Sequence, residues 1–151
     1  MARIYIDTSV FGGYFDEEFK EYSVKFFEKL IENKNTILLS DVALDELTDA
    51  PQRVKDFVNS IPKKNISRMY LDDDSKNLAL KYIKENVVGE TSLADCFHIA
   101  IATVQKADLL VSWNFKHIVN LNRIRGYNGV NLMNGYPIIE IRNPREVFDY
   151  E

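Results

Sequence analysis

Several features are scarce or missing in the 151-residue chain, and each absence excludes a class of protein. A single cysteine, Cys96, cannot form an internal disulfide, which favours a reducing compartment. The first residues lack the basic and then apolar pattern of a secretory signal, and no apolar run approaches the ~20 residues of a membrane-spanning helix. We therefore expect a cytoplasmic protein that does not associate with membranes.

Motifs for nucleotide-dependent and serine-hydrolase chemistry are also missing. The chain has no Gly-x-Gly-x-x-Gly stretch, no phosphate-loop lysine motif and no nucleophile elbow. Its two histidines, His98 and His117, are too far apart and too poorly accompanied by cysteine to indicate a zinc site, so we expect them in core or surface roles. The formal net charge of −4 argues against a protein that coats nucleic acid by bulk charge.

What is present is a regular alternation of strand-like and helix-like segments. Short apolar runs rich in branched residues predict strands at residues 3–6, 36–39, 66–71, 109–112 and 138–142. Helical spacing and start signals predict helices over 16–33, after Ser40, from Pro51, from the aspartates at 72–74, over 92–105 and over 115–125. The Gly- and Asn-rich stretch 126–135 indicates a loop.

The strands are continuously apolar and helices separate them, which predicts a parallel sheet covered by helices on both faces. A chain of this length with 46% hydrophobic residues can bury one sizeable core. We therefore expect a single domain, residues 1–151, of the α/β class: a three-layer α/β/α sandwich with a central, mostly parallel sheet. Ligands of such sheets bind beyond the carboxyl ends of the strands, so a functional site is expected there.

Two acids are placed near that edge. Asp7 directly follows the apolar residues 4–6, and it is either a functional carboxylate or a turn aspartate that caps the following amides. Glu46 lies nearer the apolar side of its helix than the three aspartates of residues 40–50 do. It is either an inward-pointing acid or an ordinary glutamate at the boundary of the core.

Two further positions carry the same ambiguity. Asp95 is the only formal charge between Glu90 and Lys106 and lies over an apolar helix surface, so it must find a partner, take up a proton or bind a metal. Its spacing from Ser92 also fits a capping box at the start of the helix. Asn114 follows a predicted strand and precedes a predicted helix, which by itself is typical of an N-cap.

Together, four short motifs resemble the PIN-domain family in content, order and spacing: YIDTS, LSDVALDEL, SLADCFHIAIA and LLVSWNFKHI. The similarity spans about residues 3–120, and the last strand at PIIEI also fits. The resemblance implies a PIN-like fold and a metal-dependent ribonuclease, which includes the VapC-like toxins of toxin–antitoxin pairs. It also implies RNA as substrate, an antitoxin protein as a possible partner, and a homodimer.

Carried over to this sequence, the resemblance assigns the catalytic acids and metal ligands to Asp7, Glu46 and Asp95, with Thr8 or Ser9 as supporting hydroxyls. Three clustered carboxylates repel one another unless a divalent cation joins them, and oxygen ligands suit Mg²⁺ or Mn²⁺. Water bound to such an ion can attack the phosphorus of an RNA backbone. The resemblance therefore implies metal-assisted hydrolysis of a phosphodiester.

The fourth family position, usually an aspartate, is Asn114 here, and Ser112 stands two residues before it as a further supporting hydroxyl. The amide removes one negative charge from the cluster. We expect its carbonyl oxygen to bind a metal-coordinated water, with weaker affinity for a second ion than an aspartate would give.

An acidic cluster repels RNA, so cations elsewhere must hold the substrate. We expect Lys116, Arg123 and Arg125, in the helix that begins beside the fourth position, to do so. Lys63, Lys64 and Arg68 form a second set of candidates. Trp113 either stacks on a base or packs in the core. Both basic sets can also be ordinary solvated faces.

Two other functions remain open. The departure at the fourth position motivates a catalytically silent PIN-fold module that binds RNA or a protein. The cluster alone also fits a metal-dependent phosphatase or a DNA nuclease, because it does not specify the sugar.

Overall fold

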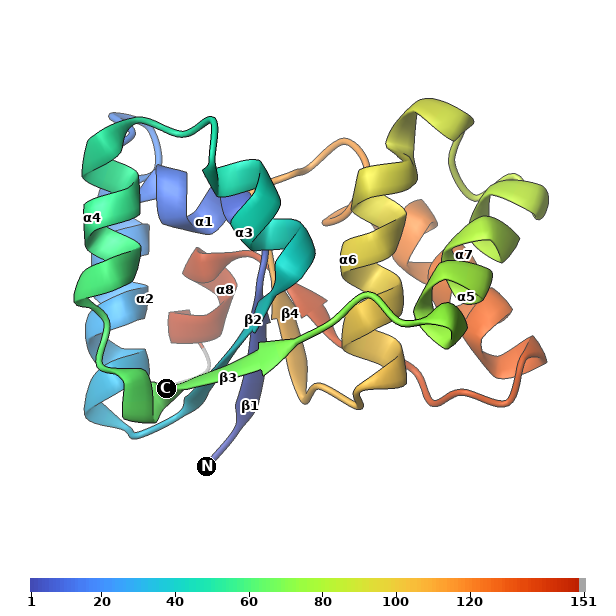
Figure 1. Ribbon diagram of the computed structural model, residues 1–151. Helices are drawn as coiled ribbons and strands as arrows, with labels where there is room; N and C mark the ends of the chain where they lie inside the picture. Colours follow the sequence, from blue (N-terminus) through green and yellow to red (C-terminus); the bar gives the residue numbers. More distant parts are fainter. Residues whose placement is uncertain (150–151) are drawn as a thin grey trace.

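The structure is a computed structural model that describes residues 1–149, and it is built around a five-stranded sheet (Figure 1). The strands are β1 (Arg3–Ile6), β2 (Thr36–Ser40), β3 (Ile66–Met69), β4 (Leu109–Val111) and β5 (Ile141–Arg142). Their order is β3-β2-β1-β4-β5, and every pairing is parallel. The first strand therefore lies in the middle of the sheet, with all carboxyl ends at one edge.

Helices cover both faces of this sheet. They are α1 (Thr8–Gly13), α2 (Lys20–Glu32), α3 (Asp41–Leu47), α4 (Gln52–Ser60), α5 (Asp73–Lys84), α6 (Leu93–Val104), α7 (Leu121–Met133) and α8 (Pro144–Asp149). Short 3-10 turns at Lys63–Asn65 and Glu90–Ser92 precede β3 and α6. Figure 1 shows α2, α4 and α8 on one side of the sheet and α5, α6 and α7 on the other, so the predicted three-layer α/β/α sandwich is confirmed.

Alternation along the strands divides the core between the two faces. In β1, Ile4 and Ile6 pack with the helices of one layer, whereas Tyr5 packs with those of the other, because successive strand side chains point to opposite faces. All three are almost fully buried. This arrangement explains the continuously apolar strands of the sequence, because both faces of the sheet are covered.

The structure differs from the sequence-based prediction after β4. The predicted helix over 115–125 is instead a turn at 115–118, and α7 occupies Leu121–Met133. The predicted loop at 126–135 is therefore largely the second half of a helix. The helix begins there because the side chain of Asn120 caps it, by accepting a hydrogen bond from the amide of Arg123 (3.3 Å).

Glycine and asparagine are compatible with α7 because the helix packs closely against the core. A Cβ on Gly126 would lie 2.7 Å from Cγ1 of Val87, so only glycine permits this approach. Asn131 is fully buried and its side-chain oxygen accepts a hydrogen bond of 2.5 Å from the hydroxyl of Tyr82. These contacts outweigh the low helix propensity of the two residue types.

Other element boundaries differ by a few residues. The predicted helix over 16–33 begins at Lys20, and the predicted strand over 138–142 is reduced to Ile141–Arg142. The helices α1 and α8 are not among the predicted elements, and each has only six residues. Among the described residues, no helix is long and apolar enough to cross a membrane.

Candidate metal centre

Asp7 lies at the middle of the sheet edge, directly after β1. Its amide donates to the carbonyl of Val111 (3.0 Å), which continues the pairing with β4, and the residue is only 5% exposed. The carboxylate oxygen Oδ2 accepts hydrogen bonds from the hydroxyls of Ser9 (2.6 Å) and Ser112 (2.8 Å). These bonds fix the carboxylate and leave its other oxygen, Oδ1, directed toward the neighbouring helices.

Those two serines are themselves held by the backbone after β4. The amide of Trp113 donates to Ser9 Oγ (3.0 Å), and the amide of Asn114 donates to Ser112 Oγ (2.9 Å). The polar residues that end β1 are thus hydrogen-bonded to those that end β4. The other predicted supporting hydroxyl, Thr8, lies elsewhere: its Oγ1 donates to Glu46 Oε1 (3.0 Å), so it contacts the second acid of the cluster and not the first.

Glu46 reaches the same place from α3. Ser40 starts this helix by accepting a hydrogen bond from the amide of Ala43 (3.0 Å), which places Glu46 in the second turn. Its side chain remains 39% exposed, but Oε1 contacts both Thr8 and His98. Burial alone would raise the pKa of this carboxyl, but the hydrogen bond and charge of His98 and the hydrogen bond of Thr8 lower it below its usual value.

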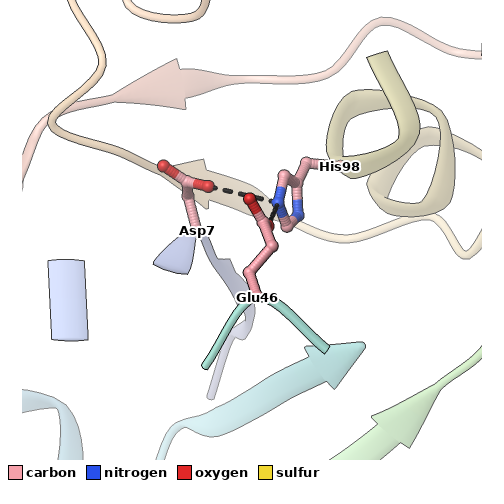
Figure 2. A group of neighbouring side chains, drawn as sticks. All are labelled: Asp7, Glu46 and His98. Carbon is pink, nitrogen blue, oxygen red and sulfur yellow. Dashed lines mark hydrogen bonds and ion pairs between the residues drawn. The ribbon is translucent and has the colours of Figure 1, made fainter. Parts of the chain in front are cut away.

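His98 is the residue that sequence reasoning set aside. It lies on α6, is 1% exposed, and directs Nε2 at Glu46 Oε1 and, at 3.4 Å, at Asp7 Oδ1 (Figure 2). Its other nitrogen, Nδ1, shares a hydrogen bond of 2.6 Å with the hydroxyl of Tyr5, which shares one of 2.7 Å with Ser40 Oγ. Burial alone would lower the pKa of His98, but Glu46 and the other nearby acids raise it.

Asp95, in the first turn of α6, lies at the border of this group. Ser92 makes no side-chain capping bond to the helix, so the alternative of a capping box is not found. Asp95 Oδ1 accepts a hydrogen bond of 3.3 Å from the side-chain amide of Asn114. Burial, and next the negative charge of Asp7, raise the pKa of Asp95. The carboxylate of Asp95 is therefore close enough to Asp7 for the two charges to interact.

Both the oxygen and the nitrogen of the Asn114 side-chain amide form hydrogen bonds. Its Oδ1 accepts hydrogen bonds from the amides of Lys116 (3.2 Å) and His117 (3.0 Å), so it caps the turn that follows, and its nitrogen faces Asp95. The prediction that its carbonyl oxygen binds a metal-coordinated water is therefore not supported, because that oxygen already accepts two backbone hydrogen bonds. The amide nitrogen offers Asp95 a donor, which an aspartate could not do.

The atoms that converge most closely come from three separate elements. One oxygen of Asp7, one oxygen of Glu46 and one nitrogen of His98 all lie within 4.8 Å of one another, and Figure 2 shows the three side chains pointing toward one another. Among the described residues this is the group whose geometry could hold a metal ion. Its two carboxylates and one imidazole fit a divalent cation.

A comparison with protein families identifies the fold that carries this cluster. The model of the PIN domain matches residues 4–114, which include Asp7, Glu46, Asp95 and Asn114. The chain belongs to the PIN-domain family. No curated protein matches the chain, so the family match and the solved structures supply the available relationships.

Solved structures share the fold of this PIN domain at low sequence identity. A chain of the crystal structure of VapBC2 from Rickettsia felis, bound to a promoter DNA fragment, has a TM-score of 0.59 and 16% identity, with 93% of this chain and 98% of that chain covered. A chain of the FitAcB structure from Neisseria gonorrhoeae has a TM-score of 0.60 and 16% identity, with 94% of this chain and 98% of that chain covered. VapC20 from Mycobacterium tuberculosis, described as a sarcin-ricin loop cleaving toxin, has a TM-score of 0.56 and 13% identity, with 75% of this chain and 91% of that chain covered.

An open groove of about 480 Å³ lies between α3 and α6 of the PIN domain. It is lined by Asp41, Val42, Asp45, Glu46, Leu71, Ala94 and Phe97. Glu46 is the residue that this groove shares with the group of Asp7, Glu46 and His98.

The predicted substrate-binding cations are not grouped on one helix. Lys116 is exposed in the turn after Asn114, and Arg125 is exposed on α7. The guanidinium of Arg123 is hydrogen-bonded to the carbonyl of Val87, so it contributes to packing between α7 and the segment before α6. These positions differ from the prediction because α7 begins at Leu121, beyond the turn.

Trp113 has a packing role in the PIN domain. Its ring is stacked on Phe19 with 4.3 Å between centroids, its indole nitrogen donates to Ser23 Oγ (2.8 Å), and the residue is only 8% exposed. Of the two interpretations that the sequence allowed, core packing is the one that the contacts support.

Proposed function

We propose that this PIN domain is a metal-dependent endoribonuclease that hydrolyses phosphodiester bonds of RNA with Mg²⁺ or Mn²⁺. The observation that carries the proposal is that Asp7 and Glu46, which are 39 residues apart in the sequence, converge at the carboxyl edge of the sheet, where Glu46 is partly exposed. Asp95 contributes the third carboxylate of the cluster. Family membership supports the same chemistry.

The polar residues around the cluster have separate roles in the proposed reaction. Ser9 and Ser112 hold Asp7 through one oxygen and leave the other for a cation, while Thr8 orients Glu46. A bound divalent cation would lower the pKa of a coordinated water and offset charge that develops on the phosphate. Asp95, whose pKa is raised, is suited to accept a proton from an attacking water.

RNA would be held outside the acidic cluster. Lys116 is the cation nearest in sequence to Asn114, and both Lys116 and Arg125 are exposed and able to contact phosphates. Arg123 is a weaker candidate because its guanidinium is already bonded to Val87. The modest number of cations favours a short contact region over extended backbone binding.

We further propose that the chain is the toxin of a toxin–antitoxin pair, held inactive by an antitoxin protein, and that it forms a homodimer. The support is structural similarity over almost the whole chain to members of the VapBC and FitAB complexes. Identification of a protein that copurifies at defined stoichiometry and suppresses RNA cleavage would test the first point. Sedimentation analysis of the purified chain would test the second.

Cleavage of structured RNA tests the central proposal. We expect the purified protein to cut RNA in Mn²⁺, to lose activity in chelator and to regain it when Mn²⁺ is restored. Asp95→Asn and Glu46→Gln should lower the rate by about 100-fold or more, since loss of outer partners alone costs about 10- to 100-fold. Asp49→Asn, at an exposed acid in the turn that follows α3, is the matched control. Cleavage that survives chelation would rule the mechanism out.

One observation favours a second function. Because Asn114 removes a negative charge and both ends of its amide are already hydrogen-bonded, the cluster is less acidic than four carboxylates would be. The alternative is a catalytically silent module that binds RNA or a protein. Calorimetry with Mn²⁺ distinguishes the two, because the silent module would bind no ion in the concentration range that supports cleavage. Parallel RNA and DNA substrates would separate a ribonuclease from a DNA nuclease.

A further inference from the structure

The buried side chain of His98 lies beside the carboxylates of Asp7 and Glu46. It is 1% exposed, and its Nε2 is directed at the same point as the free oxygens of Asp7 and Glu46. Nε2 lies 3.4 Å from Asp7 Oδ1 and in hydrogen-bonding contact with Glu46 Oε1. Asp95, by contrast, is not part of this converging group, and its Oδ1 faces the amide of Asn114.

We propose that Nε2 of His98, together with Asp7 and Glu46, ligates the divalent cation, so that the centre is a mixed nitrogen and oxygen site that selects a first-row transition ion such as Mn²⁺ over Mg²⁺. This inference rests on the metal-dependent function proposed above and specifies its cofactor. It replaces Asp95 by His98 as the third protein ligand. Asp95 remains beside the ion without direct coordination.

The spacing of the three atoms fits this role. Adjacent ligands of an octahedral ion with bonds of about 2.1 Å lie about 3 Å apart. The distance from Nε2 to Asp7 Oδ1 is close to that value, while Glu46 Oε1 must move outward to admit an ion. Glu46 is free to do so, because its side chain is 39% exposed and α3 is a helix of only seven residues. Asp7 and His98 are fixed by burial.

The second nitrogen of His98 has the partner that a metal ligand requires. A ligating histidine ordinarily donates its other ring N–H to a polar group, which fixes the tautomer and the ring orientation. Here Nδ1 can donate to the hydroxyl of Tyr5 (2.6 Å), which can donate to Ser40 Oγ (2.7 Å). Ser40 is suited to accept, because its oxygen has two lone pairs and receives one other hydrogen bond, from the amide of Ala43. With its proton on Nδ1, the imidazole could bind a cation through Nε2 in place of the present hydrogen bond to Glu46.

The donor set determines the choice of ion. Imidazole nitrogen binds first-row transition ions well, whereas Mg²⁺ prefers oxygen ligands and retains its waters. An all-oxygen site of Asp7, Glu46 and Asp95 would discriminate little between Mg²⁺ and Mn²⁺. A site that includes His98 should therefore bind Mn²⁺ more tightly than Mg²⁺.

Pulsed electron paramagnetic resonance of the Mn²⁺-loaded wild-type protein gives a direct test. Directly coordinated imidazole produces a nitrogen hyperfine coupling, and labelling of histidine with ¹⁵N changes that coupling in a recognisable way. We expect the coupling in the wild-type protein and in His117→Gln, and its loss in His98→Phe. His117 is the only other histidine, so this variant is the matched control.

Calorimetric binding of Mn²⁺ and Mg²⁺ provides a second readout that separates ligation from simple orientation of Glu46. If His98 ligates, His98→Phe should weaken Mn²⁺ binding by about 10- to 100-fold and weaken Mg²⁺ binding by a smaller factor. Equal weakening of both ions, or Mn²⁺ bound to the wild-type protein without histidine coupling, would overturn the inference while leaving a metal-dependent nuclease intact. Failure of the wild-type protein to bind either ion would overturn both proposals.

Discussion

Replacement of Asn114 by aspartate would test how the candidate centre tolerates a fourth carboxylate. The substitution preserves the shape of the side chain and can preserve the oxygen that accepts from the amides of Lys116 and His117. It converts only the amide nitrogen, which donates to Asp95 Oδ1, into an oxygen that carries negative charge. An attractive contact therefore becomes a repulsive one, with little change in packing.

The magnitude follows from the distance of 3.3 Å between Asn114 Nδ2 and Asp95 Oδ1. Two unit charges at that separation repel by about 5 kcal/mol at an effective dielectric constant of about 20. Protonation of one carboxyl limits this cost, because it requires only about 4 kcal/mol at about pH 7 for a pKa near 4. Burial and Asp7 already raise the pKa of Asp95, so protonation there requires less than this, and we expect a net loss of at most about 4 kcal/mol in the free energy of unfolding.

Chemical and thermal denaturation of metal-free protein would measure this loss, with an expected decrease in Tm. Saturating Mn²⁺ should recover at least half of it, because a cation screens the paired carboxylates. The double variant Asp95→Asn with Asn114→Asp restores an amide–carboxylate pair in the opposite order and should recover metal-free stability to within about 1 kcal/mol. The reasoning would be refuted if Asn114→Asp were as stable as the wild-type protein without metal, or if the double variant were no better than the single one.

Two further predictions concern pH and packing. Because the pKa of His98 is raised above its usual value, its contribution to stability is present below about pH 6.5 and is lost as the pH rises through the pKa of the folded state. Urea denaturation of metal-free protein at about pH 6 and about pH 8.5 should therefore show lower stability at the higher pH. His98→Phe should reduce this difference. Gly13→Ala should destabilise the fold by about 1 to 3 kcal/mol, because the new Cβ would lie 2.7 Å from both Ser23 Oγ and the indole nitrogen of Trp113. Gly129→Ala, with no atom within 4 Å of its Cβ, should instead be neutral or stabilising by up to about 1 kcal/mol, and equal effects of the two substitutions in urea denaturation would contradict the packing argument.

The sequence was informative where short-range patterns determine structure. The strand before Asp7 is continuously apolar because helices cover both faces of the sheet, and its first polar residue must therefore lie at the edge. The same logic placed Ser40 at the start of a helix, where it caps the amide of Ala43. These features depend on neighbours within a few residues, so the pattern alone predicts them.

Long-range contacts explain what the sequence could not provide. The sequence predicts a core or a surface role for His98, and the residue is buried, but its contacts depend on Glu46, 52 residues away. The available signal was its position three residues after Asp95, which places both on one helix face. Likewise, Gly126 is compatible with a helix only because Val87 lies against it, and no local pattern reveals that contact.

The hydrogen bond from Ser112 to Asp7 joins residues 105 positions apart. During synthesis, the first carboxylate is therefore made long before the strand that fixes it in place. A nascent chain that ends before β4 lacks this constraint, so its candidate metal centre is incomplete. In the nuclease proposed above, this order of events would delay activity until the segment that contains β4 has emerged from the ribosome.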